Sequence, residues 1–195
     1  MSGGIKRVRV QQRAARGWVA LAGLLAVVFS VLSGPARADS AAVIDAGTSD
    51  TLAQFKADVK GGASFLSSAA GVLVFPKVIK GGFGIGGEYG EGALQVGGKT
   101  VQYYSTASAS VGLQFGVQSK SLVVVFKTAD ALSQFRASDG WKAGVDGSIA
   151  LAKWGVGEDI STLEEQSPVI GFVIGNKGFM YNLTIEGSKF TKIDR

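Results

Sequence analysis

Glycine alternates with large apolar residues in the middle of a long apolar segment, and this pattern constrains the fold more than any other feature of the chain. Glycine stands at Gly82, Gly84 and Gly86, with Phe83 and Ile85 between them. Successive side chains of a β-strand point to opposite faces, so these three glycines share one face. Glycine inside a strand usually marks a place where another backbone or a ligand comes close. We therefore expect a second layer to pack tightly against this glycine strip (Gly82, Gly84 and Gly86).

The letters Gly82-x-Gly84-x-x-Gly87 also fit a dinucleotide-binding fingerprint. That fingerprint needs a helix directly after it and an acid about 20 residues further on. More glycine without helical apolar spacing follows Gly87 instead, and residues 105–110 contain no acid. The pattern therefore indicates a structural strand, and we expect no cofactor.

The first 38 residues have the pattern of an export signal. Basic residues from Lys6 to Arg16 precede an apolar stretch, Trp18 to Ser33, and Ala36-Arg37-Ala38 is a small-x-small cleavage site. The apolar stretch is short for a membrane-spanning helix, which needs about 20 residues. We therefore expect cleavage after Ala38, a single mature domain of residues 39–195, and a periplasmic or secreted protein that can lie peripherally on a membrane.

Removal of this leader changes the charge of the chain and narrows its chemistry. The leader holds six of the 20 basic residues and no acid, so 14 basic and 15 acidic residues remain. A net charge of −1 gives no basic surface for nucleic acid. The chain has no cysteine and no histidine, which excludes Ser-His-Asp catalysis and zinc sites built on either residue, and we expect no metal.

The mature chain is predicted to be α+β, with N-terminal helices followed by a dominant antiparallel sheet that is curved or barrel-like because of its glycines. The first helix carries Leu52, Phe55 and Val59 on one face, with Ser49 or Asp50 as its cap. This face either packs on the sheet or lies on a membrane. The other predicted elements are a short helix at 63–70, strands at 72–75, 82–86, 93–96, 100–105, 108–118, 122–126, 145–153, 169–174, 179–185 and 189–193, a hairpin turn at Gly97-Gly98, and a helix that begins after Thr128 and runs through Phe135.

Several spaced motifs resemble those of one domain family. The first is Ala70-Gly71-x-Leu73-Val74-Phe75-Pro76-x-x-x-Lys80-x-Gly82-Phe83-Gly84-x-Gly86-Gly87, followed by Gly90-Glu91-Gly92. The others are Tyr103-Tyr104, Ser110-x-Gly112-x-Gln114-x-Gly116-x-Gln118, Gly140-Trp141 with Gly144-x-Asp146, and Glu186-Gly187. Together they resemble the SYLF domain, a lipid-binding module of yeast and animal actin-patch proteins, plant FYVE-type proteins and short exported bacterial proteins.

The resemblance implies a non-catalytic protein that binds phospholipid headgroups, here in the bacterial cell envelope. We expect an anionic headgroup or membrane surface to contact Lys77 and Lys80 beside the glycine strip, with Phe83 as an apolar contact, and Lys56 and Lys60 to approach the same membrane. The N-terminal helix is less basic than in eukaryotic members, since acids stand beside its two lysines. Actin is not an expected partner of an exported protein.

Two other functions remain open from the residues. The small-residue strand faces would suit a structural periplasmic protein that self-associates as a homo-oligomer. Glu88, Glu91 and Asp146 are acids in glycine-rich surroundings, and a pair of carboxylates at the right separation can hydrolyse glycosides. The spacing of these acids in the sequence does not show that they meet.

Overall fold

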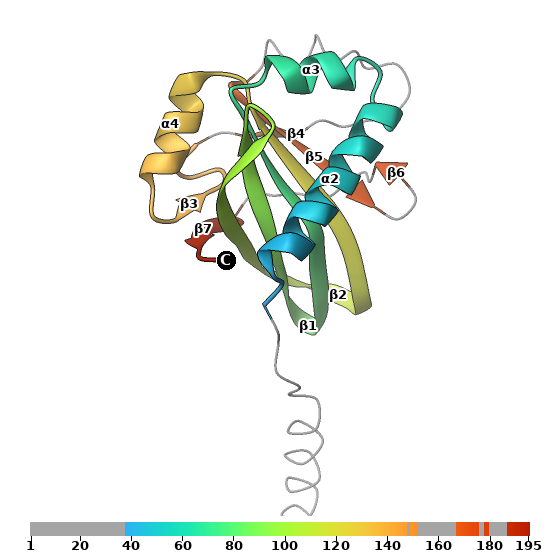
Figure 1. Ribbon diagram of the computed structural model, residues 1–195. Helices are drawn as coiled ribbons and strands as arrows, with labels where there is room; N and C mark the ends of the chain where they lie inside the picture. Colours follow the sequence, from blue (N-terminus) through green and yellow to red (C-terminus); the bar gives the residue numbers. More distant parts are fainter. Residues whose placement is uncertain (1–37, 148, 152–166, 176–177, 180–186) are drawn as a thin grey trace, which may run out of the picture. The chain divides into compact units, whose positions relative to one another are not determined.

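Two very long antiparallel strands, β1 (Gly71–Val96) and β2 (Lys99–Phe126), form the centre of the fold (Figure 1). The computed structural model describes residues 38–147, 149–151, 167–175, 178–179 and 187–195. The chain divides into two units, Met1–Ala38 and Asp39–Arg195, and all described helices and strands lie in the second.

The hairpin of β1 and β2 merges segments that the sequence predicts as separate strands. Its turn is Gly97-Gly98, as predicted, and both glycines have positive φ, 57° and 76°. The pairing shifts register at three places, between Phe75 and Val78, between Gly82 and Gly84, and next to the turn. Such shifts bend a strand without ending it. The prediction that β1 stops at Pro76 is wrong because proline is tolerated at a bulge, where the ladder does not need its missing N–H.

The glycine strip lies in β1 and has strand partners. Gly82 pairs with Gly116, Gly84 with Gly112, and Gly86 with Ser110. The side chains of residues 82–85 and 110–117 lie outside the description, so the tight second layer over the strip remains a prediction.

The structure shows a close backbone approach a few residues further along, where β1 folds back over its own first half. A Cβ atom on Gly90 would lie 2.6 Å from the carbonyl oxygen of Lys77. A Cβ atom on Gly92 would collide with the carbonyl oxygen of Val74 and with the Phe75 ring. We call this region, residues 88–92 over residues 74–80, the β1 crossing. Only glycine allows so close a contact between two stretches of backbone.

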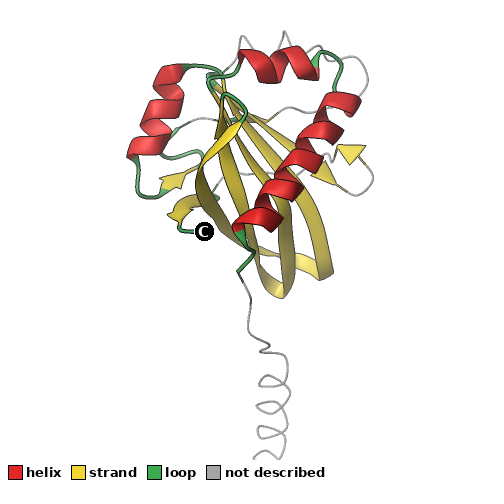
Figure 2. Ribbon diagram, in the orientation of Figure 1, coloured by secondary structure: helices red, strands yellow, loops and turns green. Residues whose placement is uncertain are grey.

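The remaining strands complete a seven-stranded sheet that is antiparallel except for one pair. Figure 2 shows that this sheet is curled. The α+β prediction is confirmed. Residues 122–126 of β2 are buried and lie between β1 and β5, which confirms a central strand covered on both faces. The other strands are β5 (Val169–Gly175) and β7 (Lys189–Ile193), both paired with β2, β3 (Trp141–Lys142) paired with β7, and β4 (Ala150–Leu151) and β6 (Gly178–Phe179) paired with β5.

Helices α2 (Ala41–Asp58) and α3 (Gly62–Ser68) cover one face of the sheet. The hydroxyl of Ser40 caps α2 by accepting a hydrogen bond from the Val43 N–H, so α2 begins well before the predicted cap at Ser49 or Asp50. Phe55 of α2 and Phe65 of α3 make edge-to-face contacts with Phe172 of β5. The N-terminal helix thus packs on the sheet in this structure.

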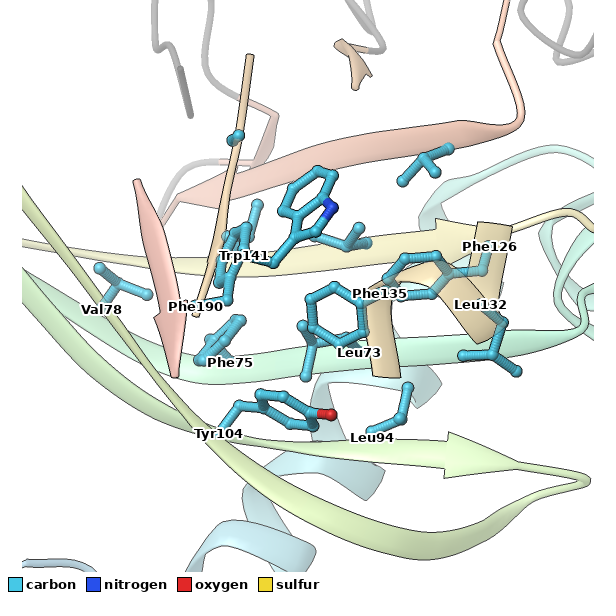
Figure 3. Close-up of a cluster of buried hydrophobic side chains, with 14 of the residues drawn as sticks. Leu73, Phe75, Val78, Leu94, Tyr104, Phe126, Leu132, Phe135, Trp141 and Phe190 are labelled. Atoms are coloured by element: carbon cyan, nitrogen blue, oxygen red, sulfur yellow. The ribbon is translucent and has the colours of Figure 1, made fainter. Parts of the chain in front are cut away.

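A second aromatic core fills the inside of the curl, and α4 (Ala129–Ala137) closes it (Figure 3). Thr128 caps α4, as predicted. The Phe135 ring lies 4.8 Å from that of Phe126 and 4.9 Å from that of Tyr104. Trp141 and Phe190 stack at 5.8 Å beside them. The paired segments 72–75 of β1 and 122–126 of β2 are therefore packed on both faces.

In the C-terminal third, β5 and β7 confirm the predicted strands at 169–174 and 189–193, but the predicted strand at 145–153 does not begin where expected. Val145, predicted to begin a strand, lies in a turn and is 70% exposed. The turn forms because the Asp146 carboxylate accepts a hydrogen bond from the Lys142 N–H. Within the predicted strand at 145–153, Ala150 and Leu151 form β4, and residues 148, 152 and 153 lie outside the described residues. Residues 180–185 of the predicted strand at 179–185 also lie outside them.

Candidate functional site

An apolar hollow of about 370 Å³ lies between α2, α3 and the turn of the β1–β2 hairpin. Leu52, Leu66 and Val72 contribute apolar walls, and the Gly97-Gly98 turn forms one side. The single basic residue of the lining is Lys56, which is exposed in the last turn of α2. We call this the α3 hollow.

A second, more open hollow of about 630 Å³ lies between α4 and the same end of the hairpin. Its lining includes Val96, Leu132 and Arg136, and Arg136 is its one charged residue. We call this the α4 hollow. It shares no residue with the α3 hollow, but the two use consecutive residues, Gln95 and Val96 of β1.

The two hollows therefore lie on opposite faces of one structural feature, the hairpin end. Consecutive residues of a strand point to opposite faces, which is why Gln95 borders one hollow and Val96 the other. Figure 1 shows α3, α4 and the hairpin turn together at this end of the domain. Each hollow combines apolar walls with one exposed cation, Lys56 or Arg136.

The structure places the predicted lysines in different environments. Lys56 borders the α3 hollow, and Lys60 is exposed just beyond the end of α2. Lys77 is exposed on β1, five residues beyond Val72 of the hollow lining. Because a strand rises about 3.3 Å per residue, this separation is roughly 17 Å. The hairpin end thus contains one predicted lysine in its lining, and Lys77 lies away from it.

Lys80 is held in an ion-pair cluster inside the curl. Its Nζ lies 3.4 Å from Oε1 of Glu88, and the Nζ of Lys120 lies 2.6 Å from Oε2 of the same carboxylate. The three side chains are only 18%, 11% and 7% exposed for Lys80, Glu88 and Lys120. Lys80 is therefore engaged by the protein itself. Sequence reasoning missed Lys120 because it lies between two segments predicted as separate strands. For Phe83, the structure gives only its place in β1.

Glu91 is at the centre of another polar cluster at the β1 crossing. Its carboxylate accepts hydrogen bonds from Nε and Nη2 of Arg195 at 3.0 and 2.6 Å, from the Tyr89 hydroxyl at 2.7 Å, and from the Asp39 N–H at 3.2 Å. Burial raises the pKa of Glu91, but the hydrogen bonds from Arg195 and Tyr89 and the charge of Arg195 outweigh it, so the pKa is lower than usual.

The three acids of the hydrolase alternative are held by different partners. Lys80 and Lys120 form ion pairs with Glu88. Arg195 and Tyr89 donate hydrogen bonds to Glu91, and the Lys142 N–H donates one to Asp146. Glu91 lies within β1. In the described part of the chain, no three acidic side chains gather as a metal-binding group. The residues that the structure describes contain no helix with both the length and the apolar character to cross a bilayer.

Residues 107–194 match the family described as Ysc84, Las17-binding protein actin regulator, which is the SYLF domain family, a lipid-binding and non-enzymatic family. This match confirms the resemblance that the sequence motifs suggested. It includes α4 and β5, whereas α2, α3 and the glycine strip precede it. No curated protein matches the chain.

Proposed function

We propose that this chain is a non-catalytic phospholipid-binding module of the bacterial cell envelope, and the match of residues 107–194 to the SYLF domain family supports this. The leader would direct export, and the mature domain would contact anionic headgroups at the membrane surface. The observation that carries the proposal is the hairpin end, where two apolar hollows each have one exposed cation at their border.

The two parts of each hollow suit the two parts of a phospholipid. The apolar walls would take methylene groups, each of which contributes about 0.8 kcal/mol when buried. Lys56 and Arg136 would contact the phosphates, and each cation near an anionic surface contributes about 1 kcal/mol. Apolar insertion would therefore supply most of the affinity, and the cations would make binding depend on lipid charge and salt.

The headgroup would then contact the hairpin end and not Lys77 and Lys80, where the sequence predicts it. Lys80 already pairs with Glu88, so a headgroup would have to compete with a nearly buried carboxylate. Lys60 is exposed just after α2 and would strengthen the attraction beside Lys56. Lys77 would act as a surface charge.

Vesicle co-sedimentation tests this function. We expect the processed protein to bind vesicles of phosphatidylcholine mixed with phosphatidylglycerol more tightly than vesicles of phosphatidylcholine alone, with weaker binding at high salt. Ala63→Asp places a charge in the α3 hollow at an exposed position in the first turn of α3, where an acid is compatible with the helix. This variant should lose binding.

The matched control is Val43→Asp, which puts the same charge at a 56% exposed position on α2 that does not line the hollow. It should bind as the unmodified protein does. Binding that is indifferent to phosphatidylglycerol, or equal losses in the two variants, would contradict the proposed surface.

A further inference from the structure

We propose that the Glu91 carboxylate is the binding site for the N-terminal α-ammonium that cleavage after Ala38 creates. Cleavage hydrolyses the Ala38–Asp39 peptide bond, so that water gives Ala38 a carboxylate and Asp39 an amino group that is protonated at neutral pH. The inference depends on the proposed export and cleavage. It does not depend on lipid binding.

The future amino group is already in place. The backbone nitrogen of Asp39 lies 3.2 Å from Oε2 of Glu91, although the two residues are 52 positions apart. The side chain of Glu91 is only 5% exposed. In the uncleaved chain this contact is a hydrogen bond from a neutral amide. An ammonium at the same position would make a charge-assisted bond, which is about twice as strong.

Cleavage adds a positive charge to a cluster in which negative charge is in excess. Three groups face the Glu91 carboxylate: the Tyr89 hydroxyl from β1, the Arg195 guanidinium after β7, and Asp39 before α2. Burial and the hydrogen bond to Glu91 raise the pKa of Tyr89, which keeps that hydroxyl neutral. The carboxylates of Glu91 and Asp39 then exceed the charge of Arg195 by one. A new α-ammonium on Asp39 would offset one of these negative charges.

The number of hydrogen-bond donors also fits. A carboxylate has about four lone-pair sites. Oε1 accepts from Tyr89 and from Nη2 of Arg195, and Oε2 accepts from Nε of Arg195 and from the Asp39 nitrogen. The Asp39 nitrogen therefore takes the last site, and the ammonium can use it without displacing another donor.

The scissile bond is accessible while the helix behind it stays capped. Ala38, Asp39 and Ser40 are exposed and precede the first turn of α2. Cleavage there leaves the Ser40 cap of α2 intact. The processed domain would then tie three parts of the chain together at Glu91: its new N-terminus, β1 and the segment after β7.

The test uses the full chain, exported by a bacterial host with its own leader and purified after processing. Mass spectrometry identifies the first residue, which we expect to be Asp39. The matched variant carries one serine inserted between Ala38 and Asp39, so that cleavage at the same site moves the ammonium away by one residue, about 3.8 Å. Thermal unfolding at neutral pH compares the two processed proteins.

We expect the Tm of the insertion variant to be roughly 2–4 °C lower. The difference should shrink as the pH rises above about 8, where α-amino groups lose their charge, and it should vanish in a Glu91→Gln background. If Glu91→Gln does not fold, the pH dependence of the first comparison decides. A first residue other than Asp39, equal Tm values at neutral pH, or a difference that persists in Glu91→Gln would overturn the proposal.

Discussion

The β1 crossing and the hairpin end differ in how their charged residues are paired. At the β1 crossing, Glu88 and Glu91 are nearly buried, and basic side chains of the same chain engage both of them. At the hairpin end, Lys56 and Arg136 are exposed beside apolar hollows. A charged group that is paired within the protein stabilises the fold, whereas an exposed cation beside apolar walls is available to a ligand. This difference separates the part of β1 that builds the domain from the part that we propose meets the lipid.

The largest effect should come from the backbone contact at the crossing. Gly92→Ala would drive a methyl group into the Val74 carbonyl oxygen, and this overpacking should lower the free energy of unfolding by about 3 kcal/mol. Gly81→Ala is the control, since its Cβ would meet nothing within 4 Å. Urea denaturation measures both variants. Equal stabilities would show that β1 does not need glycine where it crosses itself.

The ion-pair cluster gives the next effect. Glu88→Gln leaves Lys80 and Lys120 close together without a counter-charge, and we expect a loss of about 2–3 kcal/mol. This loss is at or below the smallest one expected when a partner of a fully buried ion pair is removed, because these side chains keep 7–18% exposure. Adding Lys120→Leu to Glu88→Gln should recover part of the loss, and a double-mutant cycle measures the coupling. If Glu88→Gln costs nothing, Lys80 is in effect as free as Lys56 at the hairpin end.

The sequence predicts the local features of this fold and misses its long-range ones. The Gly97-Gly98 turn, the Thr128 cap and the central strand 122–126 follow from nearby residues. The start of α2 does not, because two of its buried positions are threonines, Thr48 and Thr51, which hide the apolar stripe of a helix. Conversely, the predicted strand ends at Pro76, whereas β1 bends there and continues.

The candidate site was harder to predict for the same reason. Lys56 was identified as a lysine on an N-terminal helix, but its place beside the hairpin turn depends on how α2 packs. Arg136 carries no signal of its own in the sequence. The pairing of Glu91 with Arg195 joins residues 104 positions apart, and only the curl of the sheet brings them together.

Removal of the Arg195 side chain, which bonds to Glu91, should lower the free energy of unfolding moderately and in a way that depends on pH. Arg195→Ala removes two charge-assisted hydrogen bonds and should cost about 1–2 kcal/mol at neutral pH, since the Arg195 side chain is 18% exposed. The pKa of Glu91 is lower in the folded state than its ordinary 4.5. The stabilisation is therefore complete above that value and is lost as the pH falls through the folded-state pKa.

Denaturation of Arg195→Ala and the unmodified protein from neutral to acid pH checks this sign. The two curves should converge at low pH, where Glu91 is protonated in both. Lys192→Ala is a suitable control, because its Nζ lies 3.9 Å from the fully exposed Asp139 and such pairs contribute little. A gap between the curves that does not narrow in acid would mean that Arg195 stabilises the crossing by packing alone.

The smallest effect should separate the two groups of predicted lysines. Lys56→Gln removes the one cation of the α3 hollow, and loss of about 1 kcal/mol of attraction should weaken binding to vesicles containing phosphatidylglycerol about fivefold. Lys77→Gln removes the same charge from an exposed position on β1 and should change binding less, because its distance from the hairpin end exceeds the Debye length of about 8 Å at physiological salt. Co-sedimentation at low and physiological salt measures both variants. If Lys77→Gln weakens binding as much as Lys56→Gln does, the lipid meets the crossing as well as the hairpin end, and the division of β1 into a structural part and a binding part fails.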